Sequence, residues 1–364
     1  KYYGNPNTWD VTAVTDMSSL IANSAGSINI VHPEIGNWNT IDVTSMQNMF
    51  SGTTFNTYIG NWNTFNVENM KSMFSYNFDF NQDINTKQVT VNSVTYTAWD
   101  TQNVEIMEKM FQNARGFNQP IGNWNTSSVI GYYGMNAMFE NHNGNSIFNQ
   151  DINTKEVTVN GTTYTAWDTS GVEGMNRMFY GCWMFNQDIG KWNTTNVSDF
   201  GAMFGFARRF NCGTETPAPY TAEELAKNID TKEVTVGNNT YIAWDTQNAK
   251  FMAVMFTDAT YAATTEGFNK PIGNWNTSKV ITIEDMFRQA ERFNQDITTR
   301  KVTVGSTTYF AWDTLEIMNM KGVFEGATDF DGDVGNWNTT KVTSTITMFR
   351  DALNFSTDVR AKRV

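Results

Sequence analysis

The chain has 364 residues, a formal net charge of −12 and only 17% charged residues, while 12 Trp, 26 Phe and 19 Met supply large apolar side chains. Such an acidic chain is repelled by phosphate backbones and anionic lipid headgroups, so we expect neither a nucleic-acid partner nor direct membrane insertion. Its length favours several domains or a stack of repeats over one compact core.

One phrase recurs along the whole chain: Trp, Asp or Asn, Thr, two polar residues, Val, then Met three and six residues later, then Phe. Self-similarity of this kind is the signature of a repeat architecture. We therefore predict that residues 1–364 form a single array of about 11 repeats. The repeats start near Trp9, Trp38, Trp62, Trp99, Trp124, Trp167, Trp192, Trp244, Trp275, Trp312 and Trp337.

The centre of each repeat has the spacing of a short amphipathic helix. In the repeat that starts at Trp99, the apolar residues from Val104 to Ala114 fall at offsets 0, 3, 6, 7 and 10, which is one face of a helix. Thr101 and Asn103 lie where an N-cap is wanted. The spacing predicts a helix over residues 104–113.

A second phrase, Phe-Asn-Gln-(Asp or Pro)-Ile, follows each predicted helix, and in short repeats it runs into an extended segment such as Ile121 to Trp124. One short helix and one short strand per roughly 25 residues is typical of a leucine-rich-repeat-like solenoid. The predicted fold class is thus an α/β repeat solenoid whose core is buried by stacking. Its predicted core residues include Trp99, Met107, Met110, Phe111, Trp124, Trp167, Met175, Met178, Phe179 and Trp192.

Every second repeat carries about a dozen extra residues before the next Trp, and each insertion contains Val-Thr-Val, a turn pair and Thr-Tyr. The insertions span residues 85–98, 153–166, 230–243 and 298–311. Asn-Gly and Gly-first pairs between β-rich runs predict β-hairpins, and we expect successive hairpins to pair edge to edge into one side sheet. The turn residues are Asn92, Ser93, Asn160, Gly161, Gly237, Asn238, Gly305 and Ser306.

Residues 212–228 interrupt the repeat pattern and are interpreted as an insertion loop. Within them, Thr221 to Glu224 reads as a capping box that opens a helix of one or two turns. The only cysteines are Cys182 and Cys212. Cys182 takes a place that is alanine in other repeats, which favours free buried thiols over a disulfide bridge, although a bridge is geometrically conceivable.

Three phrases resemble the BspA-like leucine-rich-repeat surface proteins, a family that includes repeat lipoproteins of mycoplasmas. They are Phe-Asn-Gln-Asp-Ile at residues 185–189, Trp-Asn-Thr-Thr-Asn-Val at 192–197 and Met-Asn-Arg-Met-Phe at 175–179. The resemblance covers about Trp9 to Phe355. It implies a solenoid displayed on a cell surface, or outside the cell, for adhesion or recognition, with a surface protein or glycan as partner. No lipobox or anchor is visible, and the family supplies no catalytic residues.

No residue cluster indicates an active site or a cofactor. His32 and His142 are far apart in the repeat order and have neither carboxylate nor cysteine neighbours in sequence. Asp331 and Asp333 hint at calcium, but they lack further ligands and stand on the Phe-Asn-Gln-Asp template. No acidic pair suggests a carbohydrate-active enzyme. We therefore expect a non-enzymatic protein without metal or cofactor.

Two aromatic residues break the repeat pattern at a place where other repeats have Arg115, Arg208 or Glu291. These are Phe78 and Trp183, and exposed large aromatics mark contact sites, although packing against a neighbouring loop is an equal alternative. The hairpin turns are the other candidate contact residues. The competing hypothesis is a structural subunit of a filament, sheath or virion surface fibre, in which copies of the chain bind one another end to end.

Overall fold

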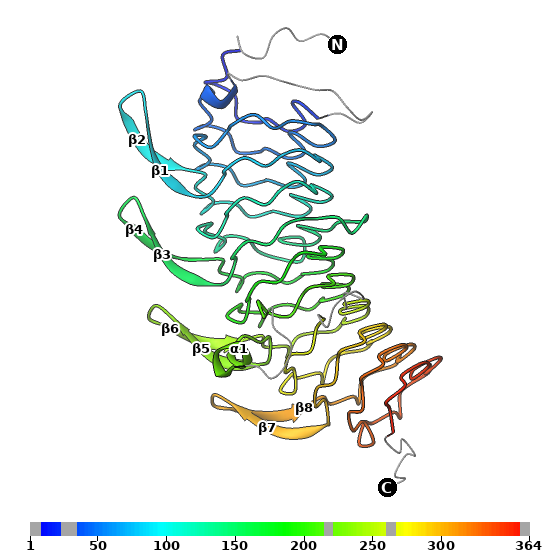
Figure 1. The fold of residues 1–364 in the computed structure, drawn as a ribbon. Coiled ribbons are helices and arrows are strands. Elements are labelled where there is room, and N and C mark those ends of the chain that lie inside the picture. Colours follow the sequence, from blue (N-terminus) through cyan, green and yellow to red (C-terminus); the bar gives the residue numbers. More distant parts are fainter. Residues whose placement is uncertain (1–8, 23–34, 215–220, 260–266, 357–364) are drawn as a thin grey trace.

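The computed structural model describes residues 9–22, 35–214, 221–259 and 267–356. In these ranges the chain winds through successive layers, each starting at one of the repeated tryptophans, and the layers stack in chain order (Figure 1). The only α-helix among the described residues is α1 (Ala222–Ala226). A single 3-10 turn lies near the start of the stack, at Ile35–Asn37. Eight strands form four hairpins: β1 (Lys87–Val91) with β2 (Val94–Ala98), β3 (Lys155–Val159) with β4 (Thr162–Ala166), β5 (Lys232–Val236) with β6 (Asn239–Ala243), and β7 (Arg300–Val304) with β8 (Thr307–Ala311).

The predicted helix of each repeat is wrong, because the residues concerned form tight turns whose remaining N–H groups bond to the next layer. In the layer of Trp99, the amides of Met110 and Ala114 donate to carbonyls three residues earlier, at 3.1 and 3.0 Å. The amides of Met107 and Phe111 instead donate to Gly134 and Met138 in the following layer, both at 2.8 Å. Elsewhere the layers are joined by parallel bridges of single residues, such as Ser45 with Asn69. The predicted α/β leucine-rich-repeat-like solenoid, with one helix and one strand per repeat, is therefore not the fold.

Turns and helix share a spacing, which explains the error. Most described layers make two consecutive turns whose third residues have left-handed backbone, such as Lys109 at φ 57° and Asn113 at φ 56°. Turns of this kind return the chain to the core every three or four residues, as a helix does, so the apolar residues keep the same offsets. Thr101, the expected N-cap, donates its hydroxyl to Asn125 O of the next layer at 2.9 Å.

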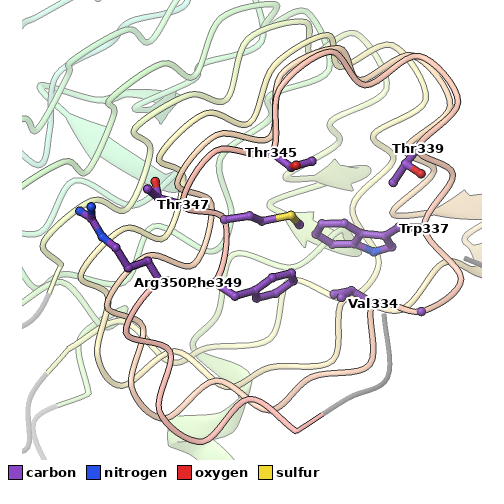
Figure 2. Close-up of a pocket in the computed structure, with 9 residues that line it drawn as sticks. Val334, Trp337, Thr339, Thr345, Thr347, Phe349 and Arg350 are labelled. Carbon is purple, nitrogen blue, oxygen red and sulfur yellow. The ribbon is translucent and has the colours of Figure 1, made fainter. Parts of the chain in front are cut away.

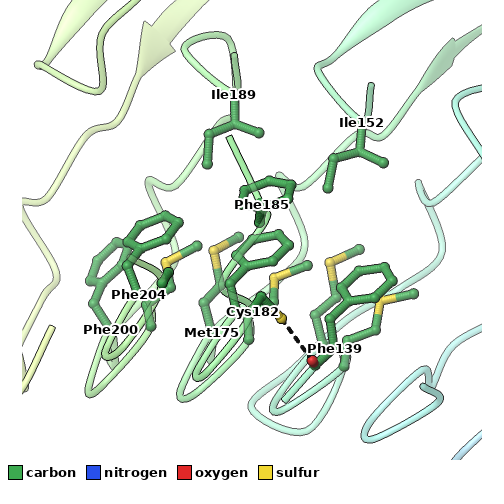
Figure 3. Packing of buried hydrophobic residues seen from close by; sticks show 14 of the residues in the cluster. Phe139, Ile152, Met175, Cys182, Phe185, Ile189, Phe200 and Phe204 are labelled. Carbon is green, nitrogen blue, oxygen red and sulfur yellow. Dashed lines mark hydrogen bonds between the residues drawn. The ribbon is translucent and has the colours of Figure 1, made fainter. Parts of the chain in front are cut away.

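Stacked aromatic rings fill the interior. The repeated tryptophans stack on one another at centroid distances of 5.9–6.4 Å where neighbouring rings are in contact. One phenylalanine column, from Phe50 to Phe349, has spacings of 5.5–5.7 Å. A second, from Phe55 to Phe355, has spacings of 5.9–6.3 Å. Methionines and isoleucines fill the space around these rings (Figure 3). None of the predicted core residues named above is more than 2% exposed: Trp99, Met107, Met110, Phe111, Trp124, Trp167, Met175, Met178, Phe179 and Trp192.

The Asn of the Phe-Asn-Gln phrase links each layer to the next through its side chain. Asn149 donates its amide N–H to the side-chain oxygen of Asn118 at 2.9 Å, and its own side-chain oxygen accepts the N–H of Asn186 at 2.8 Å. Gln187 Nε2 donates to the same oxygen of Asn149 at 2.9 Å. Asp331 takes the corresponding place and accepts from the N–H and hydroxyl of Ser356. Asp331 thus belongs to this asparagine ladder, as the acceptor of the next layer.

The predicted hairpins are confirmed at all four insertions. At the Asn160-Gly161 turn both residues have positive φ, as a type I′ turn requires, whereas only the first residue does at Gly237-Asn238. A hydrogen bond closes the base of each hairpin, where the chain leaves and rejoins the stack. A threonine hydroxyl donates to the carbonyl of the following tryptophan, as Thr86 does to Trp99 O at 2.6 Å. The tryptophans that follow hairpins have left-handed φ between 48° and 50°, an uncommon conformation for a bulky residue.

The expected side sheet does not form, since each hairpin is a separate two-stranded sheet. The hairpins lie along one flank of the stack with their turns directed toward its N-terminal end, so that each meets its neighbour with its turn and not with a strand edge (Figure 1). Accordingly, Asn160 Nδ2 lies 3.4 Å from Thr97 Oγ1 of the preceding hairpin. A side chain at Gly237 would collide with Glu156 in the same way.

The predicted capping box is present: Thr221 accepts from the N–H of Glu224, whose carboxylate accepts in return from the N–H of Thr221. Residues 215–220 of the predicted insertion loop lie outside the described residues. The ammonium of Lys270, which is fully buried, donates to Glu224 O at 2.8 Å. This contact attaches the short helix α1 to the next layer of the stack.

Both thiols are free and buried, as predicted. Cys182 lies within the core, and its Sγ donates to Phe139 O at 2.9 Å (Figure 3). Burial in apolar surroundings raises the pKa of Cys182 and of Cys212. Neither group therefore has the thiolate character of a reactive cysteine.

Candidate functional site

The hairpin turns form a row on one flank of the stack (Figure 1). All eight predicted turn residues are exposed: Asn92, Ser93, Asn160, Gly161, Gly237, Asn238, Gly305 and Ser306. The outward faces carry a cross-strand pair of threonines in every hairpin, as in Thr90 with Thr95 at 2.8 Å between hydroxyls. The hairpins therefore present hydroxyl and amide groups at intervals of two layers.

Tyrosine anchors hold the hairpins against the stack. Tyr96 donates its hydroxyl to Asn61 O at 2.5 Å, and Tyr164, Tyr241 and Tyr309 make the corresponding bonds to other layers. Burial raises the pKa of each of the latter three tyrosines to about 12, so they stay protonated donors at neutral pH. The hairpins are thus fixed to the flank by their inner faces.

The crevice between the second and third hairpins is small. It has a volume of about 40 Å³ and is lined by Asp168, Ser170 and Asn193 of the stack and by hairpin residues such as Tyr241. A volume of this size holds a water molecule or two and no larger ligand. Contacts made by the hairpin row would therefore use its exposed surface.

Phe78 and Trp183 are half-buried and do not stand free in solvent. The guanidinium of Arg115 lies 4.8 Å from the centre of the Phe78 ring, and that of Arg208 lies 4.5 Å from the Trp183 ring. Trp183 also packs so closely on Gly144 that a Cβ there would lie 2.1 Å from its Nε1. The structure places both aromatics in contacts with neighbouring layers and loops, and it does not bring them together with the hairpin turns.

A larger pocket of about 550 Å³ opens on the last described layer (Figure 2). Its apolar wall consists of Trp337, Met348 and Phe349, where the tryptophan column and the first phenylalanine column reach this layer. Arg350 at its rim is paired with Glu325. The pocket could receive flat apolar groups, and it contains no catalytic arrangement of acids or bases.

Sequence reasoning missed a protruding loop at Ile130–Gly134, which we call the tyrosine bulge. Its exposed side chains are Ile130, at 57%, Tyr132, at 39%, and Tyr133, at 62%. The Tyr132 hydroxyl donates to the buried carboxylate of Asp199 two layers away, at 2.6 Å. The sequence does contain a sign of this insertion. Met135 follows Val129 by six residues, whereas in other repeats the first Met follows the Val by three residues.

In the described part of the chain, no group of three or more His, Cys, Asp and Glu side chains could hold a metal ion. The buried carboxylate of Glu140 is paired with Arg177 at 2.7 Å and lies 3.7 Å from His142 Nδ1. His32 lies outside the described residues. In the described ranges, no helix is long and apolar enough to cross a membrane.

Comparison with known proteins identifies one family. The model of a family described as "Mycoplasma protein of unknown function, DUF285" matches residues 2–98, 86–216, 232–311 and 301–363. These matches follow one another along nearly the entire chain, as expected of tandem repeats. No curated protein and no solved structure matches the chain.

Proposed function

The chain belongs to this DUF285 family of tandem-repeat proteins, and from that premise we propose that it is a non-enzymatic recognition or adhesion protein that binds through its row of hairpins. The observation that carries the proposal is the row itself: four hairpins with exposed turns, anchored on one flank by tyrosine side chains. Because the hairpins repeat at intervals of two layers, a partner could make several weak contacts at once, and the overall binding would be stronger than any single contact.

A location at the cell surface or outside the cell is part of this proposal. The family is associated with BspA-like repeat surface proteins, and the repeat phrases of the chain resemble those proteins. The partner would be a protein or glycan on a host or neighbouring cell. Labelling intact source cells with a membrane-impermeant reagent tests this location, and protection of the protein until lysis would contradict it.

The function is tested by shortening all four hairpins to the direct link seen at Gly122–Trp124. We expect attachment to cells to fall at least tenfold, while far-UV circular dichroism and the melting temperature show that the stack remains folded. A companion variant keeps the hairpins but replaces the eight outward threonines of their cross-strand pairs by alanine. Loss in both variants assigns contact to the outward faces, and loss in the shortened variant alone assigns it to the turns. Full attachment by both would contradict the proposal.

The second candidate is a filament subunit that assembles end to end. The pocket beside Trp337 and Phe349 favours it, because the apolar wall of this pocket would accept the aromatic side chains of a further layer. Light scattering coupled to size exclusion, with negative-stain imaging, tests this idea by showing whether rods lengthen with concentration. Thr345, which is exposed and lines the pocket, is a suitable site, since Thr345→Lys adds a charge there without removing a core side chain.

A further inference from the structure

The tyrosine bulge is held in place by several independent contacts. Gly174, beside it, has no room for a side chain, since a Cβ there would lie 2.3 Å from Tyr132 O. The carboxylate of Asp199 accepts the Tyr132 hydroxyl at 2.6 Å and the N–H of Gly201 at 2.7 Å. This hydrogen bond to Asp199 raises the pKa of Tyr132 to about 12, so the donor keeps its proton at neutral pH. Tyr132 is fixed, and Tyr133 packs edge-on against it at 5.2 Å between ring centres.

The ammonium group of Lys71 lies over the exposed Tyr133 ring, and that of Lys109 shares a carboxylate partner with it. Lys71 Nζ lies 6.0 Å from the centre of that ring, and it also pairs with Glu108 at 2.6 Å. Lys109 Nζ lies 3.4 Å from the same carboxylate. The side chains of Lys71 and Lys109 are 38% and 41% exposed, whereas that of Glu108 is only 7% exposed. The two cations thus face solvent and the anion lies beneath them, so these three side chains together carry a net charge of about +1, although the chain as a whole is acidic.

The exposed Tyr133 ring, packed against the anchored Tyr132 and close to the Lys71 ammonium group, fits an acidic sugar. The ring offers a flat apolar face to the C–H groups of a pyranose, and Lys71 and Lys109 offer charge-assisted hydrogen bonds to its carboxylate. The overall charge of −12 disfavours densely charged polyanions such as nucleic acids. A glycan with one carboxylate per disaccharide has a lower charge density and avoids most of this repulsion.

We propose that the tyrosine bulge, with Lys71 and Lys109, is a binding site for carboxylated glycans. The site deepens the proposed recognition function by naming a ligand class, but it does not use the hairpins. Tyr133 and the two lysines would touch the sugar, and Tyr132 would position Tyr133.

Titration of the purified chain with a hyaluronan hexasaccharide, followed by calorimetry and by saturation-transfer NMR, tests the site. We expect saturable binding that weakens at least tenfold in Tyr133→Ala and in Lys71→Met. Tyr58→Ala is the matched control, because Tyr58 is 45% exposed and also has an ammonium, that of Lys87, 5.7 Å from its ring centre. This control should bind as the parent does. Chitohexaose, which has no carboxylate, should bind at least tenfold more weakly.

Several outcomes would overturn the proposal: no binding of the hexasaccharide by the parent, equal binding by Tyr133→Ala, or equal binding of chitohexaose. Binding of a hexaglutamate peptide as strongly as hyaluronan would also overturn it, because that would indicate an acidic-peptide site. The hairpin-shortened variant separates the two proposals. It should keep hyaluronan binding while it loses attachment to cells, and loss of hyaluronan binding in this variant would remove the bulge as the site.

Discussion

Replacing Phe111 by alanine is expected to lower the free energy of unfolding by about 3 to 5 kcal/mol, the range measured for large aromatic side chains deleted from cores. Phe111 is 2% exposed. Its ring lies 5.6 and 5.5 Å from those of Phe74 and Phe139 in the adjacent layers, and 4.1 Å from that of Phe117 in its own layer. The cavity would therefore border three layers at once, and Trp99→Ala should act similarly in the neighbouring column.

Urea unfolding followed by tryptophan fluorescence measures this loss, with hydrogen exchange to show where it spreads. Because layers in a repeat array are coupled to their neighbours, faster exchange should extend into the layers that contain Phe74 and Phe139. Phe65→Ala is the matched control, since Phe65 is 42% exposed and its removal should cost under about 1 kcal/mol. If Phe111→Ala unfolds at the same urea concentration as Phe65→Ala, the assignment of the aromatic columns as the main stabilising feature is wrong.

Replacing Asn149 by leucine should destabilise the stack by about 1 to 3 kcal/mol, because two donors lose their acceptor. Both donors are half-buried, so each costs less than a fully buried unsatisfied group would. The donors are the N–H of Asn186 and the amide of Gln187, which are 2.8 and 2.9 Å from the Asn149 side-chain oxygen. The loss should appear as a lower urea midpoint with an unchanged slope.

The chain itself supplies the control for this variant. Asp331 stands at the equivalent place and accepts two hydrogen bonds from Ser356, so Asn149→Asp retains the acceptor. The aspartate variant should lose less than half of what the leucine variant loses. Equal losses would mean that the asparagine ladder contributes little and that the side chain merely fills space.

Local turn chemistry and spacing determined how far the sequence could predict this fold. Asn160-Gly161 predicts a hairpin because both residues tolerate the left-handed conformation that a type I′ turn needs, and the hairpin is there. The apolar residues from Val104 to Ala114 led to the wrong prediction of a helix. Their spacing alone cannot distinguish a helix from consecutive turns whose N–H groups bond to the next layer. Glycines would have distinguished the two: Gly322 and Gly326 occupy the left-handed turn positions of their layer, where a helix would be weakened.

The candidate site was predictable in part. The hairpin turns followed from Asn and Gly pairs, but the half-buried state of Phe78 and Trp183 depends on Arg115 and Arg208 of the following layers, which sequence distance conceals. The tyrosine bulge was concealed for a similar reason. Its anchor, Asp199, is 67 residues from Tyr132, and only the stacking of layers brings the two together.

The threonine hydrogen bond at the base of each hairpin separates the exposed hairpin residues, whose sequence can vary, from the aromatic core residues, which must stay the same. Each excursion leaves its layer and rejoins it within 13 residues, from Thr86 to Trp99 in the first hairpin, and the contact fixes both ends against the aromatic column. Changes of sequence or length beyond that base therefore alter the surface offered to a partner without disturbing the packing of the rings. The exposed strand faces of the four hairpins can therefore vary one hairpin at a time on an unchanged core, whereas the turns that contact the preceding hairpin, such as Gly237 beside Glu156, are constrained.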